Sequence, residues 1–394
     1  MRSSLVTVWL VGFTLISLDT SARAGSLSGL FESPLFRRLE LAQIAPALAT
    51  TVASSYPVAS ASSSVTYVYN PTLETFERET RVAGPIIGER AETIGKGAFN
   101  FAASYSYVHL TTINGDDLDQ LVNRVTVGGR LIVFPVKGGT TLKDGRFTNF
   151  LPVRVVADLD VEAHIFAPSL TYGVTPDFDV NLTVPLVRTA LDVTADTEVP
   201  DPRLPQFAVP AGPTRGSRSL SDSAFGVGDI LLRAKYILRR ERPFDVAAGL
   251  GLSLPSGDVN NFQGSGTTRV QPTLIVSRIF ADRFQPLVNI GMDLNADDVG
   301  RSVFRWAVGG TATLVGPLTG ALVFLGRDEL GAQADKIQRP FFFQIERDDI
   351  FDASVGFRWR FADNGVVALN ALVPLNNDGL RPDVIPTVEV EYAF

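Results

Sequence analysis

The sequence predicts an all-β protein, a transmembrane antiparallel β-barrel of about 12 strands in the outer membrane. Three observations predict this fold. The chain begins with an export-like segment, it continues with apolar residues alternating at a period of two, and its connecting segments alternate between long and short. We divide the chain into residues 1–24, a signal peptide; 25–97, an N-terminal segment outside the barrel wall; and 98–394, the barrel.

Residues 1–24 have the pattern of a cleaved export signal. Arg2 supplies a positive start, Leu5 to Leu18 form an apolar run, and Ala22 and Ala24 supply a small-x-small cleavage site before Gly25. The run is too short to span a bilayer as a helix, which argues against the alternative of a membrane anchor. Because the chain has 0 cysteines, a lipid-modified cysteine and disulfide bonds are excluded.

The composition favours strands over helices. The chain has 394 residues, of which 45% are hydrophobic, and it contains no second apolar run long enough for a spanning helix. Its 26 Phe, 34 Gly and 24 Pro are spread through short alternating segments. The formal net charge of −7 and the lack of a basic patch interleaved with aromatics argue against nucleic acid as a partner.

The N-terminal segment, 25–97, shows no period of two over its first part. We expect one helix around Leu35 to Ala45, stopped by Pro46, in a segment that is either periplasmic or inside the barrel. Residues 65–97 are expected to be a plug or a periplasmic lead-in, and the sequence leaves both open.

From Ala98 onward apolar and polar residues alternate. Phe99, Phe101 and Tyr105 fall on one face, opposite Ser104 and Ser106. Further strands are expected at 160–172, 178–186, 224–238, 244–254, 267–280, 284–295, 303–314, 318–327, 350–361, 366–373 and 384–394.

The connections between these segments alternate in length. Short turns are expected at 173–177, 239–243, 281–283, 316–317 and 362–365. Long loops are expected at 112–157, 195–222, 255–266, 296–302, 328–349 and 374–383, and residues 125–134 could be strand-like inside the first of them. Outer-membrane barrels combine short periplasmic turns with long outer loops, and an even strand count returns both ends of the barrel to the periplasm. A soluble sandwich has no reason to follow this order.

The last strand carries an expected outer-membrane insertion signal. Its apolar face consists of Val388, Val390, Tyr392 and Phe394, and its other face includes Glu389 and Glu391. A charge at the lipid midplane costs about 2–4 kcal/mol for Arg or Lys, so charged faces are expected to point into the lumen.

The same argument gives a set of candidate lumen or constriction residues: Asp179, Asp229, Arg233, Lys235, Arg358, Arg360, Glu389 and Glu391. Strand direction predicts that Asp179 lies close to Lys235 or Arg233, near the periplasmic end. Arg358, Arg360, Glu389 and Glu391 are expected to gather at that end. Such a cluster either filters solutes at a charged constriction or stiffens a narrow barrel through a packed salt-bridge network.

Two motifs at a fixed spacing resemble a known family. Gly226, Gly228 and Asp229 form a Gly-x-Gly-Asp motif, followed by a Leu-Pro-Ser-Gly-Asp motif that contains Pro255, Gly257 and Asp258. The region from Asp160 to Phe394 resembles outer-membrane transporters associated with a meta-pathway of phenol degradation. Residues 88–95, Gly-Glu-Arg-Ala-Glu-Thr-Ile-Gly, resemble a lead-in seen in some members. The resemblance implies a barrel that passes small hydrophobic or aromatic compounds. The glycines alone indicate a bend or bulge, and the Pro-Ser-Gly-Asp run indicates an outer turn.

Several kinds of chemistry are not supported. The 2 histidines, His109 and His164, are too few for an ordinary transition-metal site, so neither a metal nor another cofactor is expected. Ser104 and Ser106 are expected on the strand face opposite His109, which argues against a hydrolase. The acidic pairs at 116–117, 297–298 and 348–349 fall in expected outer loops and could bridge cations to lipopolysaccharide or remain solvated.

Three functions stay open at this stage. The first is a passive channel or facilitator for small molecules. The second is a structural or adhesive barrel with a packed lumen, and the third is a barrel-embedded hydrolase. The expected partners are outer-membrane lipid, lipopolysaccharide, the barrel-assembly machinery and a small-molecule solute, in the outer membrane of a Gram-negative cell.

Overall fold

The computed structural model describes residues 26–32, 45–54, 67–70, 75–78, 83–122, 133–141, 147–152, 154–198, 215–241, 243–331 and 349–394. The expected signal peptide, the Pro-rich run 199–214 and most of the expected loop 328–349 lie outside these residues. In the described part of the chain, no helix is both long and apolar enough to cross a membrane.

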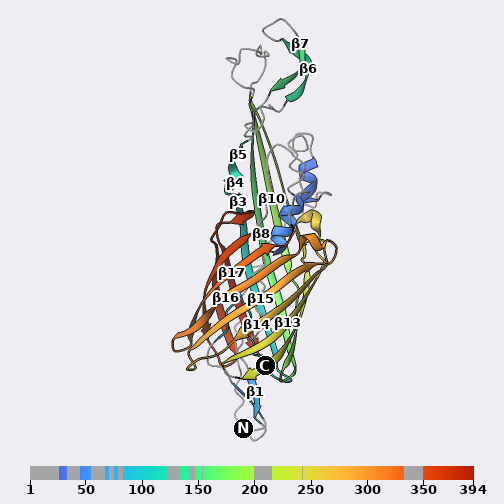
Figure 1. Cartoon of the computed structure of the whole chain (residues 1–394). Helices are drawn as coiled ribbons and strands as arrows, with labels where there is room; N and C mark the ends of the chain where they lie inside the picture. Colours follow the sequence, from blue (N-terminus) through green and yellow to red (C-terminus); the bar gives the residue numbers. More distant parts are fainter. Residues whose placement is uncertain are drawn as a thin grey trace, which may run out of the picture.

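The described residues form a closed antiparallel barrel of 12 strands, as predicted (Figure 1). Two of the strands are interrupted, one at Pro185 and the other at Gly228. In chain order the strands are β3 (Phe99–Ile113), β8 (Arg154–Thr175), β9 (Phe178–Thr183) continued by β10 (Leu186–Glu198), β11 (Arg215–Val227) continued by β12 (Ile230–Glu241), β13 (Phe244–Leu254), β14 (Arg269–Ser277), β15 (Phe284–Asn295), β16 (Val303–Val315), β17 (Leu318–Glu329), β18 (Ile350–Arg360), β19 (Gly365–Pro374) and β21 (Ile385–Ala393).

The remaining described elements are short. They are η1 (Leu27–Glu32), α2 (Ala45–Ser54), β1 (Tyr67–Asn70), β2 (Thr75–Arg78), β4 (Asp116–Asp117), η3 (Leu118–Gln120), β5 (Leu121–Val122), β6 (Val133–Thr141), β7 (Phe147–Pro152), η4 (Val259–Asn261), η5 (Val299–Arg301) and β20 (Leu380–Pro382). The hairpins β1–β2 and β6–β7 form two-stranded sheets of their own, at opposite ends of the molecule (Figure 1).

The last strand closes the barrel against the first. β21 pairs with β3, and the seam ends in two reciprocal hydrogen bonds between Phe99 and Phe394, at 2.7 and 2.8 Å. Both ends of the barrel domain therefore lie at the end that carries the short turns. We call this the periplasmic end, since short turns face the periplasm in outer-membrane barrels.

An apolar outer surface surrounds the barrel wall. On β18, Phe357 and Trp359 are about half exposed, and the expected insertion-signal residues of β21 are all exposed on the same outer surface. Inward-facing residues alternate with them, for example Ser354 and Arg358 on β18, which are buried. The predicted assignment of faces is confirmed for these strands.

Beyond the membrane section the pattern of faces inverts. Near the periplasmic end of β8 the exposed outward residues are apolar, Phe166 and Leu170, while inward Thr171 is polar. Further along the strand the outward residues are acidic, such as Asp158, and the inward ones are apolar, such as Leu159. An apolar inner face and a charged outer face suit water rather than lipid. We call this upper part of β3, β8, β10 and β11, which rises above the other strands in Figure 1, the extracellular extension.

The inner face of the extension is covered by η1 and α2, which we call the N-terminal cap. Leu27 and Phe31 of η1 and Leu48 and Val52 of α2 are essentially fully buried in one cluster with the inner side chains of β8 and β10. Phe262, which follows η4, joins the same cluster. The cap is thus held at the extracellular end by apolar burial, the main driving force for packing of this kind.

Three expectations about local structure are wrong. Pro46 does not stop a helix, because it is the second residue of α2, where its fixed φ and missing N–H are tolerated. The expected helix at 35–45 falls mainly on residues outside the described part. β10 continues to Glu198 and β11 starts at Arg215, in a stretch that was expected to be a loop. Val193 and Ala195 of β10 are buried in the cluster with the N-terminal cap, and Leu220 and Ala224 of β11 pack against it. The expected loop 112–157 likewise contains β4 to β7.

Candidate functional site

A segment without regular secondary structure crosses the inside of the barrel near its periplasmic end. We call residues 84–97 the strap. It contacts β18 at Pro85, β15 and β12 at Glu89, and the turn between β8 and β9 at Thr93. Gly88 and Gly95 have φ of 98° and 102°, a conformation that favours glycine. The strap therefore bends twice as it follows the inner wall.

The end of the strap joins β3 through a close approach that requires Gly173. A Cβ atom at position 173 would lie 1.7 Å from the carbonyl oxygen of Gly95. This approach allows Gly97 to donate to the carbonyl of Gly173 at 2.7 Å, while Gly173 donates to that of Ala98 at 3.0 Å.

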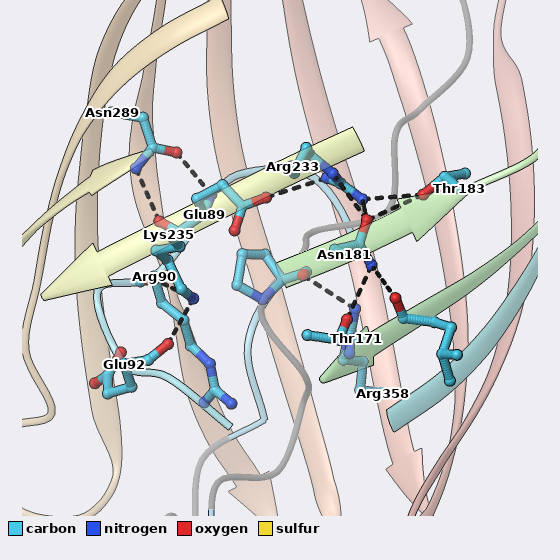
Figure 2. Close-up of polar contacts among 12 residues, drawn as sticks. Glu89, Arg90, Glu92, Thr171, Asn181, Thr183, Arg233, Lys235, Asn289 and Arg358 are labelled. Carbon is cyan, nitrogen blue, oxygen red and sulfur yellow. Dashed lines mark hydrogen bonds and ion pairs between the residues drawn. The ribbon is translucent and has the colours of Figure 1, made fainter. Parts of the chain in front are cut away.

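Glu89 is bound at the middle of the strap by two strands (Figure 2). Its backbone N–H donates to Asn289 Oδ1 at 2.7 Å, and Asn289 Nδ2 donates back to the Glu89 carbonyl at 2.8 Å. This amide imitates the reciprocal pairing of a β-ladder. The Glu89 carboxylate forms an ion pair with Arg233 of β12 at 3.3 Å, and Arg233 also donates to Asn181 Oδ1 at 2.8 Å.

Lys235 and Asp179 hold the next turn of the strap. Lys235 Nζ donates to the carbonyls of Arg90 and Glu92 at 3.2 and 2.5 Å. Asp179 Oδ2 accepts the N–H of Ile94 at 2.8 Å. Asp179 and Lys235 are direct cross-strand partners, which confirms their predicted proximity. The Lys235 ammonium group donates to carbonyls of the strap, and the Asp179 carboxylate accepts from one of its amides. Each charged group therefore binds the kind of backbone group that can be its hydrogen-bond partner.

Glu92 connects the strap to β14 and β15. Its carboxylate accepts from Gln285 Nε2 at 2.6 Å and from Ser277 Oγ at 3.2 Å. The same Ser277 hydroxyl accepts the N–H of Ala91 at 2.8 Å. These bonds are made by neutral wall side chains, so they stabilise the strap without adding fixed charge to the wall.

Arg358 anchors the start of the strap. This buried side chain on β18 donates to the carbonyl of Pro85 at 3.0 Å, and it forms ion pairs with Glu389 at 3.0 Å and Glu391 at 3.1 Å. The predicted gathering of Arg358, Glu389 and Glu391 is therefore observed. Arg360 lies at the end of β18, outside the cluster, and it has no ion pair among the described residues.

Asp229 does not line a constriction, and this expectation is corrected. It lies at the extracellular start of β12, where it accepts the N–H groups of Gly257 and Ser265, at 3.1 and 2.7 Å, and the Ser265 hydroxyl, at 2.7 Å. The carboxylate thus fixes the loop between β13 and β14, residues 255–267, which we call the motif loop. The Gly-x-Gly-Asp motif and the Leu-Pro-Ser-Gly-Asp motif are therefore in contact, through the hydrogen bond from Gly257 to Asp229.

The motif loop positions the N-terminal cap. Asp258 caps η4 by accepting the N–H of Asn260 at 2.9 Å. Asn261 then accepts the N–H of Leu27 at 3.1 Å through Oδ1, and the hydroxyl of Thr189 at 2.6 Å through its carbonyl. Phe262 adopts a φ of 56° and is fully buried beneath the cap.

The sequence did not reveal the neutral wall residues that bind the strap. Asn289, Gln285 and Ser277 are inward-facing polar residues like many others in the barrel. The only available signal was residues 88–95, which resemble a family lead-in and which prove to be the core of the strap. Ser104, Ser106 and His109 lie as predicted: Ser106 bonds to Thr387 at 2.9 Å inside the wall, while His109 bonds to Asp160 at 3.0 Å on the outer face.

Comparisons with known proteins give the family. A family described as "Putative MetA-pathway of phenol degradation" matches residues 144–373, more than half of the chain. The chain belongs to this family. Among curated proteins, no relative matches this chain.

Several solved structures with a similar fold are outer-membrane channels or transporters. An outer-membrane channel from Pseudomonas putida F1 is 12% identical and covers 77% of this chain and 98% of its own, with a TM-score of 0.46. A toluene transporter from Ralstonia pickettii is 12% identical and covers 76% and 89%, with a TM-score of 0.32. The P. putida toluene transporter is 9% identical and covers 75% and 89%, with a TM-score of 0.35. The family is given by the family match, and these structures share the β-barrel fold with this chain.

Proposed function

We propose that this protein is a gated outer-membrane channel for small hydrophobic or aromatic compounds, and that the strap is its periplasmic gate. The family description, which refers to phenol degradation, supports the solute class. The gate is supported by the geometry of residues 84–97 inside the barrel.

The observation that carries this proposal is that the strap is not part of the barrel ladder. β3 pairs directly with β21 and with β8, so the wall is closed without the strap. Between Pro85 and Ile94 the strap is bound by wall side chains, including Arg358, Lys235 and Asn289. Side-chain bonds can break and re-form without opening a ladder, so the strap can move while the barrel stays intact.

The charged candidates then act together as a latch. Asp179, Arg233, Lys235 and Arg358 bind strap groups directly, and Glu389 and Glu391 fix Arg358. In the latched state the periplasmic end is closed, and a solute passes only when these bonds are broken. Transport is passive, since none of the contacts supplies energy.

A reversible covalent lock tests the gate. Ala91 N lies 2.8 Å from Ser277 Oγ, so cysteines placed at positions 91 and 277 are close enough to be joined, and the chain has 0 native cysteines to interfere. We expect cells that carry the double variant Ala91→Cys/Ser277→Cys in their lipopolysaccharide-coated outer membrane, which slows unassisted entry, to take up toluene or phenol at the native rate only after reduction. The single variants, each treated with the same oxidant and reductant, are the controls.

The result separates the proposal from a structural barrel. Equal uptake in the oxidised and reduced states would exclude strap movement as the gate. No uptake by the native chain, in a barrel shown to be folded, would favour the alternative of a structural or adhesive barrel with a packed lumen.

We also propose how the chain reaches the membrane. Residues 1–24 would be removed as an export signal, which N-terminal sequencing of the mature protein tests. Val388, Val390, Tyr392 and Phe394 would be recognised by the barrel-assembly machinery, and acidic groups of the outer loops would contact lipopolysaccharide through cations. Loss of membrane insertion after replacing Phe394 with Ser is the expected outcome.

A further inference from the structure

The extracellular half of the inner wall is strongly charged, but its charges balance. Arginines and carboxylates stand side by side there in equal number: Arg269, Arg305, Arg327 and Arg381, with Asp293, Asp352, Glu329 and Asp349. Arg269 pairs with Asp293 at 2.7 Å, and Arg381 pairs with Asp352. Arg327, Glu329 and Asp349 have partners of their own. An ion entering this region would meet a like charge as closely as an opposite one, so the region suits a neutral polar solute.

A partly open cavity lies in this region, beneath the last turn of α2. It holds about 60 Å³ between Ser54 of α2 and the inner wall of the barrel. The wall contributes several apolar side chains and one ion pair, including Leu372, Leu380, Ile385, Asp352 and Arg381. An apolar lining with a small number of polar groups is typical of sites that bind small organic molecules.

Asp352 is the group in this cavity that can accept a further hydrogen bond. Its Oδ1 atom accepts from Arg381, which also donates to the carbonyl of Phe351. Its Oδ2 atom has no hydrogen bond to any residue that the structure describes, and the side chain is 17% exposed, so a small molecule in the cavity can reach it. A carboxylate oxygen binds only a donor, and a phenol O–H is a stronger donor than an alcohol O–H because it is more acidic.

The cavity is too small to enclose a whole aromatic ring. A cavity of about 150 Å³ holds benzene, whereas this one holds about 60 Å³. A ring can therefore enter only by one edge, and the opposite edge remains in the lumen. Substituents next to an inserted hydroxyl would collide with the apolar lining, whereas a substituent on the opposite carbon points out of the cavity.

We propose that this cavity is a binding site for the hydroxyl edge of a neutral phenol. The hydroxyl donates to Asp352, the adjacent ring atoms pack against Leu372 and Ile385, and the rest of the ring lies in the lumen. The proposal rests on the proposed function, because it names a class of solute and its site in the same channel. The family description refers to phenol degradation, and it gives neither a binding group nor a preference among phenols.

The first test measures binding with three probes, using the mature chain in amphipol and empty amphipol as the blank for partition. The first probe, para-methylphenol, carries its substituent opposite the hydroxyl. The second, anisole, is an isomer of it without a hydroxyl. The third is a phenol with a methyl group on each side of the hydroxyl. We expect para-methylphenol to bind in isothermal calorimetry, and the other two probes each to bind at least about tenfold more weakly.

Two variants, each with a matched control, locate the binding. Asp352→Asn weakens the acceptor and should reduce para-methylphenol binding by about tenfold or more. Asp293→Asn changes a carboxylate that is likewise paired with an arginine, outside the lining of the cavity, and should leave binding unchanged. Leu372→Phe fills part of the cavity without changing any charge and should also weaken binding, whereas Leu369→Phe, on the outer face of the same strand, should not.

Three results would overturn the proposal. Equal affinities for para-methylphenol and anisole would show that the hydroxyl is not recognised. Undiminished binding of the ortho-dimethylated phenol, or of para-methylphenol by Leu372→Phe, would place the binding outside this cavity. Equal losses in Asp352→Asn and Asp293→Asn would assign the effect to the charge balance of the wall rather than to the acceptor in the cavity.

This readout is independent of the gate. If para-methylphenol binds in the cavity while the covalently locked strap makes no difference to uptake, the site stands and the proposed gate fails. If the lock blocks toluene uptake while para-methylphenol does not bind, the gate stands and the phenol site fails.

Discussion

Replacing Lys235 with Met is the most direct perturbation of the strap. The lysine donates to two strap carbonyls, at 3.2 and 2.5 Å, and its loss leaves the ladder bonds of β12 untouched. Methionine keeps the length and apolar volume of the side chain. The change therefore isolates the ammonium group.

The size of the effect follows from these two bonds. A hydrogen bond to a charged group contributes about 1.5–3 kcal/mol, and part of this gain is offset because the buried ammonium no longer has to be desolvated. We expect the strap to be bound more weakly by about 2–4 kcal/mol. This corresponds to a rise of roughly 30- to 1,000-fold in the equilibrium constant for opening.

Hydrogen exchange of the strap amides measures this opening directly. The N–H of Ala91 donates to Ser277 and that of Ile94 to Asp179, so both amides exchange only when the strap leaves the wall. In Lys235→Met both should exchange faster by the predicted factor, and planar-bilayer recordings should show a larger open fraction. Lys96→Met, at an exposed lysine of the strap's end, is the matched control.

One result would refute the reasoning. If Ala91 and Ile94 exchange at the native rate in Lys235→Met while the barrel remains folded, the strap is not held by Lys235. If their exchange accelerates but conductance does not change, the strap opens without being the gate.

The remaining predictions concern the strap's end, the motif loop and the extracellular extension. Gly173→Ala should displace the strap or prevent folding, because the new methyl group would lie 1.7 Å from the Gly95 carbonyl oxygen; a native hydrogen-exchange pattern at Gly97 would contradict this. Asp229→Asn should destabilise the motif loop by about 1–3 kcal/mol, because the charged acceptor of three hydrogen bonds is lost. Proteolysis within 255–267 should then become faster. Asp258→Asn keeps a capping group and should have a smaller effect. Partial desolvation raises the pKa of the largely exposed Asp158 in the extension, outside the membrane section, and the nearby Asp119, Asp160, Asp196 and Asp192 raise it further. The folded extension therefore binds this proton more tightly than the unfolded one, so the resulting stability is complete below the ordinary pKa of aspartate and is lost as pH rises through the raised pKa. Hydrogen exchange of β8 and β10, corrected for the intrinsic pH effect, should slow as pH falls, and Asp158→Asn should remove this dependence.

The sequence determined the barrel wall. Residues such as Phe357 and Arg358 alternate because lipid contacts one face of each strand and the lumen contacts the other. Apolar and polar residues therefore alternate along the strand with a period of two. The alternation of loop lengths gave strand direction. Strand direction together with charge placed Asp179 beside Lys235.

Only the tertiary structure placed the segments that lack a period. The strap binds Asn289 and Arg358, which are 200 and 273 residues away from their partners Glu89 and Pro85 in the chain. Which inward residues meet the strap depends on the stagger of the strands around the barrel, and no local pattern encodes that stagger. The same reason explains why Asp229 was misplaced, since its partners lie in a loop on the next hairpin. It also explains why the pairing of Arg305 with Arg327 was not predicted, because the two become neighbours only through the register of β16 and β17. The alternation of apolar and polar residues depends on a single strand and its surroundings. These sites depend instead on which residues of several strands lie at the same height in the barrel.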